Sequence, residues 1–251
     1  MLLRSVAGLV FCAGSCVVQA GDWVSLDSFK EPSAVVPAPW QIVQLSNKVA
    51  PTRYRIARWD GVLGIEANAE HSMALLVRPV EVDLSRTPVL CWRWRIDAPL
   101  VKADMATKAG DDYAARVYVS FALPPSEIGW MLRSKLALAR AIWGDAVPDA
   151  ALNYVWDNRY PVGTRKLNAY TDRTRMIVAE SGAANTGKWV EARHDVLQDV
   201  IAEFGSSQAQ MIQLAVASDT DNTGETAHAG FADFHLVDRN TACFTDSSDN
   251  N

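Results

Sequence analysis

Three arginines, Arg93, Arg95 and Arg116, have a spacing along the chain that suits the binding of an anionic ligand. Each alternates with apolar residues, a pattern typical of a half-buried strand. Alternation puts these arginines opposite the core, so side-by-side strands would gather them on one face of one sheet. Guanidinium groups bind carboxylate, sulfate or phosphate through paired hydrogen bonds. We therefore predict an arginine face that binds an anionic ligand; the alternative is a set of cross-strand salt bridges.

Polar and aromatic neighbours extend this candidate binding site. Tyr118 shares the predicted face of Arg116, and Asn153 and Trp156 lie in an aromatic segment, residues 153–160. An aromatic ring can stack on the apolar side of a sugar. A tyrosine beside an arginine would also suit a polysaccharide lyase, if both lie in an open groove. We add Tyr118, Asn153 and Trp156 to the predicted ligand-binding residues.

The densest cluster of oxygen ligands is the segment 219–225. Its candidate calcium ligands are Asp219, Asp221, Asn222 and Glu225. The segment resembles the start of a calcium loop, but Thr223 replaces the third ligand and Gly230 rather than Glu occupies the twelfth position. The predicted strands on both sides of the segment exclude an EF-hand. Carboxylate oxygens in a turn between strands can still hold calcium. The alternative is a tight turn in which Asp and Asn side chains bond to the backbone.

Other catalytic patterns are weak or absent. Asp111 and Asp112 are adjacent, so on a strand they would point to opposite faces and not form the carboxylate pair of a glycosidase. We expect Asp112 to pair with Arg116 or to cap a loop. The sequence has no H-E-x-x-H or G-x-S-x-G motif, and its four histidines are scattered. The glycine-rich segment 182–188 is followed by Trp189 rather than Ser or Thr, so we predict a turn and not a phosphate loop.

Short strands dominate the pattern. Period-two alternation recurs in residues 54–57, 62–67, 73–77, 89–96, 113–121, 175–180, 211–218 and 229–236. Turn-rich stretches separate these segments. This arrangement predicts an all-β fold, a two-sheet antiparallel β-sandwich of jelly-roll-like form.

One segment breaks the strand pattern. Residues 126–144 repeat apolar side chains at helical spacing after Pro124 and Pro125, with Ser126 as the expected N-cap. We predict an inserted amphipathic helix that packs over a sheet edge or the mouth of the sandwich. A second, shorter helix is predicted at residues 196–204.

Composition and the chain ends set further limits. The 251 residues are 49% hydrophobic and 21% charged, which indicates a folded globular protein, and the net charge of −5 disfavours general nucleic-acid binding. Residues 1–20 read as a signal peptide, which predicts a periplasmic or secreted protein. We expect a single β-sandwich domain over residues 21–244, with no transmembrane segment, and a disordered polar tail over residues 245–251. Cys91 and Cys243 either pair in an oxidising compartment or remain separate thiols.

Several blocks together resemble a family of bacterial secreted proteins known as domain of unknown function 3047. The blocks are residues 92–95, 110–119, 152–156, 180–182 and 219–225, within a resemblance that spans about residues 40–236. The helical segment 126–144 departs from the family pattern as a longer insertion. The resemblance implies a jelly-roll-like sandwich similar to carbohydrate-binding modules, and it implies no established activity.

Three functions fit these observations. The first is a non-catalytic binding domain for a glycan or another anionic polyhydroxylated ligand. The second is a secreted polysaccharide hydrolase or lyase. The third is a structural envelope domain without a small ligand. The sequence does not fix the oligomeric state, and calcium is the one candidate cofactor.

Overall fold

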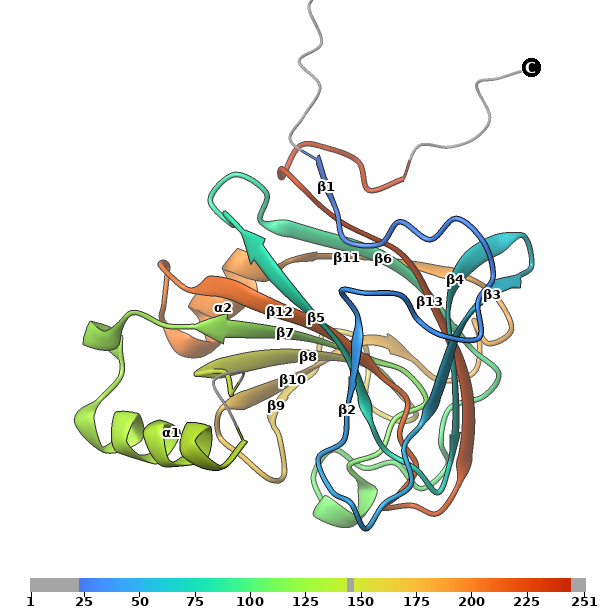
Figure 1. Cartoon of the computed structure of the whole chain (residues 1–251), viewed down its shortest axis with the longest axis horizontal. Helices are drawn as coiled ribbons and strands as arrows, with labels where there is room; N and C mark the ends of the chain where they lie inside the picture. Colours follow the sequence, from blue (N-terminus) through green and yellow to red (C-terminus); the bar gives the residue numbers. More distant parts are fainter. Residues whose placement is uncertain (1–22, 144–146, 245–251) are drawn as a thin grey trace, which may run out of the picture.

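The computed structural model describes residues 23–143 and 147–244. In this part of the chain, two β-sheets pack face to face and two α-helices lie at their margins (Figure 1). The all-β sandwich with an inserted helix is confirmed. The predicted signal peptide, residues 1–20, and the predicted tail, residues 245–251, lie outside the described residues.

The first sheet has six strands in the order β11-β6-β13-β4-β3, and β1 pairs with the last residues of β13. Their bounds are β1 Trp23–Ser25, β3 Arg53–Trp59, β4 Val62–Glu70, β6 Val89–Ile96, β11 Val190–Asp195 and β13 Thr226–Val237. Every ladder in this sheet is antiparallel.

The second sheet has seven strands in the order β2-β5-β12-β7-β8-β10-β9. Their bounds are β2 Gln41–Val43, β5 Leu75–Val82, β7 Arg116–Ala122, β8 Ala150–Asp157, β9 Arg165–Leu167, β10 Thr174–Ser181 and β12 Gln210–Ala217. The ladder between β8 and β10 is parallel, so the sandwich is mostly rather than wholly antiparallel.

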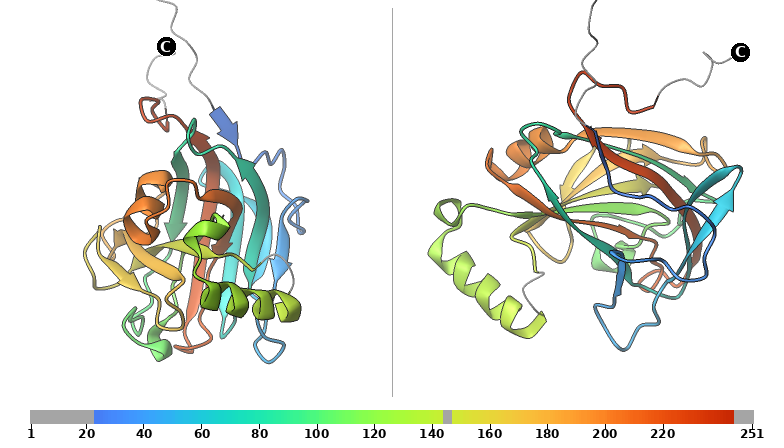
Figure 2. Two further views of the ribbon diagram at one scale, coloured as in Figure 1. Left: turned by 90° about the vertical axis from the view of Figure 1, so that its left-hand side faces the viewer. Right: turned by 45° about the horizontal axis from the view of Figure 1, so that its top comes forward.

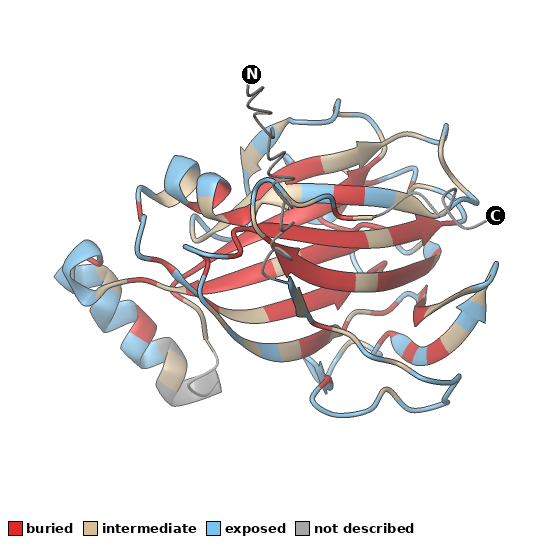
Figure 3. Ribbon diagram, turned by 90° about the horizontal axis from the view of Figure 1, so that it is seen from above, coloured by how far each residue is buried: buried red, intermediate tan, exposed pale blue. Residues whose placement is uncertain are grey.

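The core lies between the sheets, as the alternation predicts. On β6 the side chains of Leu90, Trp92, Trp94 and Ile96 are fully buried. Inward-facing side chains of β7 meet them in one apolar cluster. Buried residues accordingly concentrate on the strands in Figure 3. The sequence did not predict strand β8, because all eight of its residues are buried and the strand therefore lacks the alternation of polar and apolar residues.

The inserted helix differs from its prediction. Pro125–Glu127 forms a separate 3-10 turn, and Ile128 then takes an extended conformation, so α1 begins at Trp130 rather than near Ser126. Helix α1, Trp130–Trp143, projects beside the sandwich instead of lying flat over a sheet edge (Figures 1 and 2). The shorter helix α2, Val196–Phe204, is confirmed. The Asp195 side chain caps its first turn, and Gly205 ends it in a left-handed conformation.

A disulfide joins Cys91 on β6 to Cys243. The sequence left open whether these two cysteines pair or remain separate thiols, and the structure shows that they pair. The bond fixes the segment after β13 against Val89 and Val237, which pack with both cysteines in a small apolar cluster. Neither helix of the described chain has the length and apolar character needed to cross a bilayer.

Asp27, two residues after the end of β1, makes the stability of the fold depend on pH. Burial raises the pKa of Asp27 from 3.8 to about 6, although hydrogen bonding to the backbone of Phe234 lowers it. A carboxyl group with a raised pKa stabilises the folded state while protonated, and this contribution is lost as the pH rises through the folded pKa. The free energy of unfolding should therefore fall between about pH 4 and pH 7.

Asp27→Asn stays neutral over this range. We expect the variant to gain up to about 3 kcal/mol of stability relative to the parent protein as the pH rises from 4 to 7. Urea unfolding of both proteins at each pH measures the gain. A stability difference that does not change with pH would contradict the role of Asp27.

Candidate functional site

A buried ion pair lies at the start of β7. Arg116 pairs in register with Ala217, the last residue of β12, and Asp219 follows two residues later. The guanidinium of Arg116 donates to both carboxylate oxygens of Asp219, with Nε 2.7 Å from Oδ1. Both side chains are 2% exposed. The pair therefore connects β7 to the segment that leaves β12.

The remaining donors of Arg116 are also occupied. Nη2 donates to the carbonyl oxygen of Asp111 at 2.6 Å, and Nη1 lies 2.9 Å from the hydroxyl of Tyr118 and 3.4 Å from Oδ1 of Asp111. A guanidinium with these five contacts has little hydrogen-bonding capacity left for a ligand. Arg116 is a structural ion-pair member, which is the alternative the sequence left open.

Negative charge exceeds positive charge around this pair. Burial raises the pKa of Asp219 to about 7; Arg116 opposes this shift, while Asp112 and Asp111 add to it. Burial opposes the charge of Arg116, but Asp219, Tyr118 and Asp111 together outweigh the effect of burial, and the pKa of Arg116 rises. Burial is the largest cause that raises the pKa of Asp221, and the charge of Asp112 raises it further. One guanidinium thus lies among four carboxyl groups.

Asp112 organises the neighbouring turn. The backbone N–H groups of Asn222 and Thr223 donate to one of its oxygens at 2.9 and 2.6 Å, and the amide of Asn222 donates to the other at 2.9 Å. Of the two roles expected for Asp112, the structure shows the loop cap. Arg116 pairs with Asp111 and Asp219 rather than with Asp112. Sequence analysis did not connect Asp112 to this turn, because 110 residues separate them.

The candidate calcium ligands are only partly assembled. Carboxylate oxygens of Asp112, Asp219 and Asp221 lie within 4.8 Å of one another, and Asn222 stands beside them. Glu225 does not join this group, because its oxygens accept the backbone N–H groups of Val101 and Lys102 at 2.9 and 3.0 Å. Arg116 and backbone donors already occupy Asp219 and Asp112, so the geometry favours a hydrogen-bonded turn.

A pocket of about 340 Å³ opens above the ion pair. Its polar lining includes Asp111, Asn168, Tyr170, Asp221 and Asn222, and its apolar lining is formed by Leu45, Met73 and Leu75. Tyr170 is 54% exposed, and its hydroxyl donates to Oδ1 of Asn222 at 2.9 Å. Asn168 donates to Asp111 at 2.9 Å. An exposed ring and several polar groups therefore share one concave site.

The structure brings three predicted ligand-binding residues together. Arg116 and Tyr118 lie on the outer face of β7, and Asn153 pairs with Tyr118 on the neighbouring strand β8. Asn153 is fully buried under this region, where its amide contacts the sulfur of Met176 at 3.3 Å. Of the three, Arg116 and Tyr118 line the pocket itself.

The prediction that Arg93, Arg95 and Arg116 share one face of one sheet is wrong. Arg93 and Arg95 lie on β6 in the six-stranded sheet, whereas Arg116 lies on β7 in the seven-stranded sheet. Alternation indicates which residues face away from the core, but it does not assign a strand to a sheet. Arg93 pairs with Glu191 at 2.9 Å, and Arg95 stacks on Trp59 and pairs with Asp60.

Trp156 cannot offer a ring to a ligand from the surface. It is 1% exposed, packs 5.6 Å from Trp94 and donates its indole N–H to the carbonyl of Gly182 at 3.0 Å. Sequence analysis missed Asn168 and Tyr170, which follow the three-residue strand β9. A loop without periodicity gives no local signal that its residues face a pocket.

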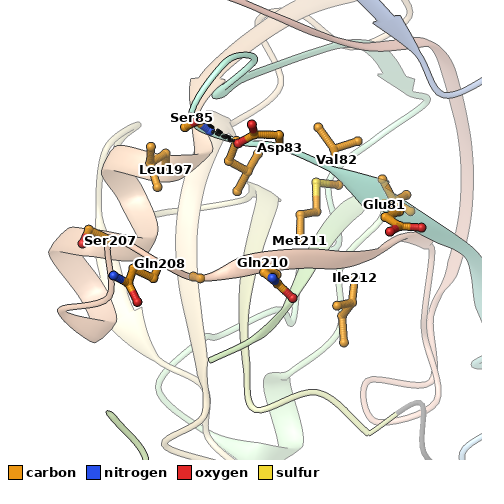
Figure 4. A pocket seen from close by; sticks show the side chains of 13 residues that line it. Glu81, Val82, Asp83, Ser85, Leu197, Ser207, Gln208, Gln210, Met211 and Ile212 are labelled. Atoms are coloured by element: carbon orange, nitrogen blue, oxygen red, sulfur yellow. Dashed lines mark hydrogen bonds between the residues drawn. The ribbon is translucent and has the colours of Figure 1, made fainter. Parts of the chain in front are cut away.

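A larger hollow of about 700 Å³ lies between the end of β5 and the start of β12, against Leu197 of α2 (Figure 4). It opens where the pairing of β12 shifts register between Met211 and Gln213. Oδ1 of Asp83 accepts bonds from the backbone and hydroxyl of Ser85 at 2.9 and 2.7 Å. The residues around this hollow, all in the described part of the chain, include no aromatic ring. The pocket at Tyr170 is the better candidate site.

Arg116→Ala tests the structural role of the ion pair. The substitution leaves Asp219 and Asp111 buried without their cation, so we expect a loss of about 3 kcal/mol or more in the free energy of unfolding. Arg53→Ala is the control, because it removes an exposed pair with Glu70 at 3.7 Å and should cost about 1 kcal/mol or less. Denaturant unfolding measures both. Equal losses would contradict the role assigned to Arg116.

Calcium should leave the melting temperature unchanged, because protein donors already satisfy Asp112 and Asp219. Asp112→Ala should lower it, at a cost of about 1–3 kcal/mol for the unpaired backbone groups. Thermal unfolding with added calcium and with chelator measures both effects. A calcium-dependent rise that disappears in Asp221→Ala would identify the turn as a metal site.

Comparison with known proteins gives one family match. Residues 38–235 match the family described as "Protein of unknown function (DUF3047)". No curated protein matches the chain. One solved structure with a weak likeness is a meso-active thermo-stable cellulase derived from the Cel12A cellulase of Rhodothermus marinus, at 14% identity and a TM-score of 0.39, covering 86% of this chain and 100% of that one. That likeness is too weak to carry an argument. Since the family match extends over most of the sequence, the chain belongs to the DUF3047 family.

Proposed function

We propose that this protein binds a neutral glycan, without chemical conversion, in the pocket beside Tyr170. The observation that carries the proposal is an exposed tyrosine ring in a concave site with carboxylate and amide groups. Sugars present apolar C–H faces and rows of hydroxyl groups. A ring packs on the former, and carboxylate and amide groups accept or donate hydrogen bonds to the latter.

The charge of the pocket favours a neutral ligand over the anionic one expected from the arginines. Asp111, Asp219 and Asp221 all line it, and among the lining residues that the structure describes Arg116 is the one cation. Because the contacts of Arg116 are already made within the protein, a carboxylate or sulfate on the ligand would meet mainly negative charge.

The chemistry of the pocket argues against a hydrolase or lyase. A hydrolase needs two carboxyl groups that are free to reach the substrate, but both oxygens of Asp219 bond to Arg116, and the oxygens of Asp111 accept from Arg116 and Asn168. Among the described residues that line the pocket, only the carboxyl group of Asp221 remains. A lyase needs a tyrosine that can lose its proton. Burial raises the pKa of Tyr118, despite the opposing charge of Arg116, so Tyr118 holds its proton at neutral pH.

We place this binding function in the periplasm or outside the cell. The support is the signal-like segment at residues 1–20 together with the disulfide between Cys91 and Cys243, since disulfides persist in oxidising compartments.

Tyr170→Ala tests the binding site. Removing the ring should weaken binding of a neutral oligosaccharide roughly tenfold. The melting temperature should change little, because Tyr170 is 54% exposed. A glycan array of the full mature protein selects the ligand, and titration calorimetry measures its affinity. Trp130→Ala, which removes the ring of a residue that is 73% exposed outside the pocket, should leave the affinity unchanged.

Four outcomes contradict the proposal. Binding restricted to acidic glycans refutes the neutral ligand. New reducing ends on bound glycans refute a non-catalytic role. Equal affinity of Tyr170→Ala and the parent protein refutes the site. A complete lack of glycan binding supports the structural envelope domain instead.

A further inference from the structure

Helix α1 has a face that the other described residues leave exposed. It follows β7, projects beside the sandwich and returns the chain to β8 (Figures 1 and 2). Leu136 is buried and Leu132 is partly buried against the core. These two side chains lie on one side of the helix, since residues four apart share a face.

The opposite side is apolar and exposed. Met131 and Leu138, seven residues apart, fall on one stripe at 58% and 64% exposure, and Trp130 borders it at 73%. Figure 3 shows the helix as mostly exposed. A tryptophan, a methionine and a leucine gathered on one exposed helix face are unusual for a surface in contact only with water.

Positive charge flanks this apolar stripe. Arg133 and Lys135 are exposed, and within residues 23–143 and 147–244 neither forms an ion pair. The third cation, Arg140, bonds to Asp149 at 2.9 Å. The helix sequence contains no Asp or Glu, whereas the whole chain carries a net charge of −5. The helix is thus a local basic element on an acidic protein.

We propose that α1 anchors the protein to the surface of an anionic lipid bilayer. Its exposed stripe would enter the boundary between headgroups and acyl chains, where tryptophan is favoured. Arg133 and Lys135 would remain among the anionic headgroups. At 14 residues the helix is about 21 Å long, too short to cross a hydrocarbon core of about 30 Å, so it lies in the membrane plane.

Charge complementarity favours lipid over a protein groove as the occupant. Cations beside an apolar stripe match the layered order of a bilayer surface, in which anionic groups lie above hydrocarbon. The anchor also leaves the glycan pocket accessible. Arg116 at the floor of the pocket begins β7, and α1 follows the other end of that strand, so the two sites lie at opposite ends of β7. This inference does not rest on the proposed glycan binding.

Vesicle flotation of the full mature protein tests the anchor. We expect the protein to float with phosphatidylglycerol vesicles and not with phosphatidylcholine vesicles, and the bound fraction to fall as salt is added. Arg133→Gln and Lys135→Gln should each lower the partition coefficient about fivefold. Met131→Ser with Leu138→Ser should abolish flotation. Bromine-labelled phosphatidylglycerol should quench tryptophan fluorescence in the parent protein, with a smaller effect in Trp130→Phe.

The control is Val101→Ser with Val162→Ser, which removes two side chains that are 80% and 60% exposed outside α1. It should float like the parent protein. Circular dichroism and the melting temperature establish that each variant is folded. Absence of flotation with phosphatidylglycerol overturns the proposal, as does flotation that the α1 variants leave unchanged. Capture of a defined protein partner by α1, without lipid binding, also overturns it.

Discussion

The ion pair between Arg116 and Asp219 is the interaction on which the candidate site depends. It joins the first residue of β7 to the segment leaving β12, two strands that are neighbours in the seven-stranded sheet. A charge buried to this extent is tolerated only when its partner and its remaining hydrogen bonds are in place. Asp111 and Tyr118 supply those bonds, and in doing so they are held at the floor of the pocket.

The same pair determines what the pocket can bind. An arginine that neutralises one aspartate and contacts a second has no charge to spare for an anionic ligand. The carboxyl groups that remain around it make the site acidic, and Asp112 holds the adjacent turn through three N–H donors. Hydroxyl groups of a neutral sugar can bond to such a site without a net charge of their own, and Tyr170 adds an apolar surface.

The two ends of β7 differ in character. The pocket, with its excess of carboxyl groups, lies where the strand begins, and the basic, partly apolar helix α1 follows where it ends. Attraction of α1 to anionic lipid would orient the molecule, because the acidic end would be repelled from the same surface. The acidic pocket and the basic helix are therefore complementary parts of one charge distribution.

Local pattern was sufficient to predict the class of fold. Alternation of β6 and β7 identified the strands and their buried faces, because side-chain direction has a period of two along any strand. Turn residues marked the segment after β12, and the helix predicted at residues 196–204 matches α2. Pattern failed at β8, which is buried on both faces, and at the loop that carries Asn168 and Tyr170.

Only the tertiary structure decided that Arg93 and Arg95 lie on a different sheet from Arg116, that Asp112 reaches a turn 110 residues away, and that Trp156 is enclosed. The physical reason is that periodicity fixes direction within an element, whereas strand order, loop closure and burial of charge arise from contacts between residues distant in sequence.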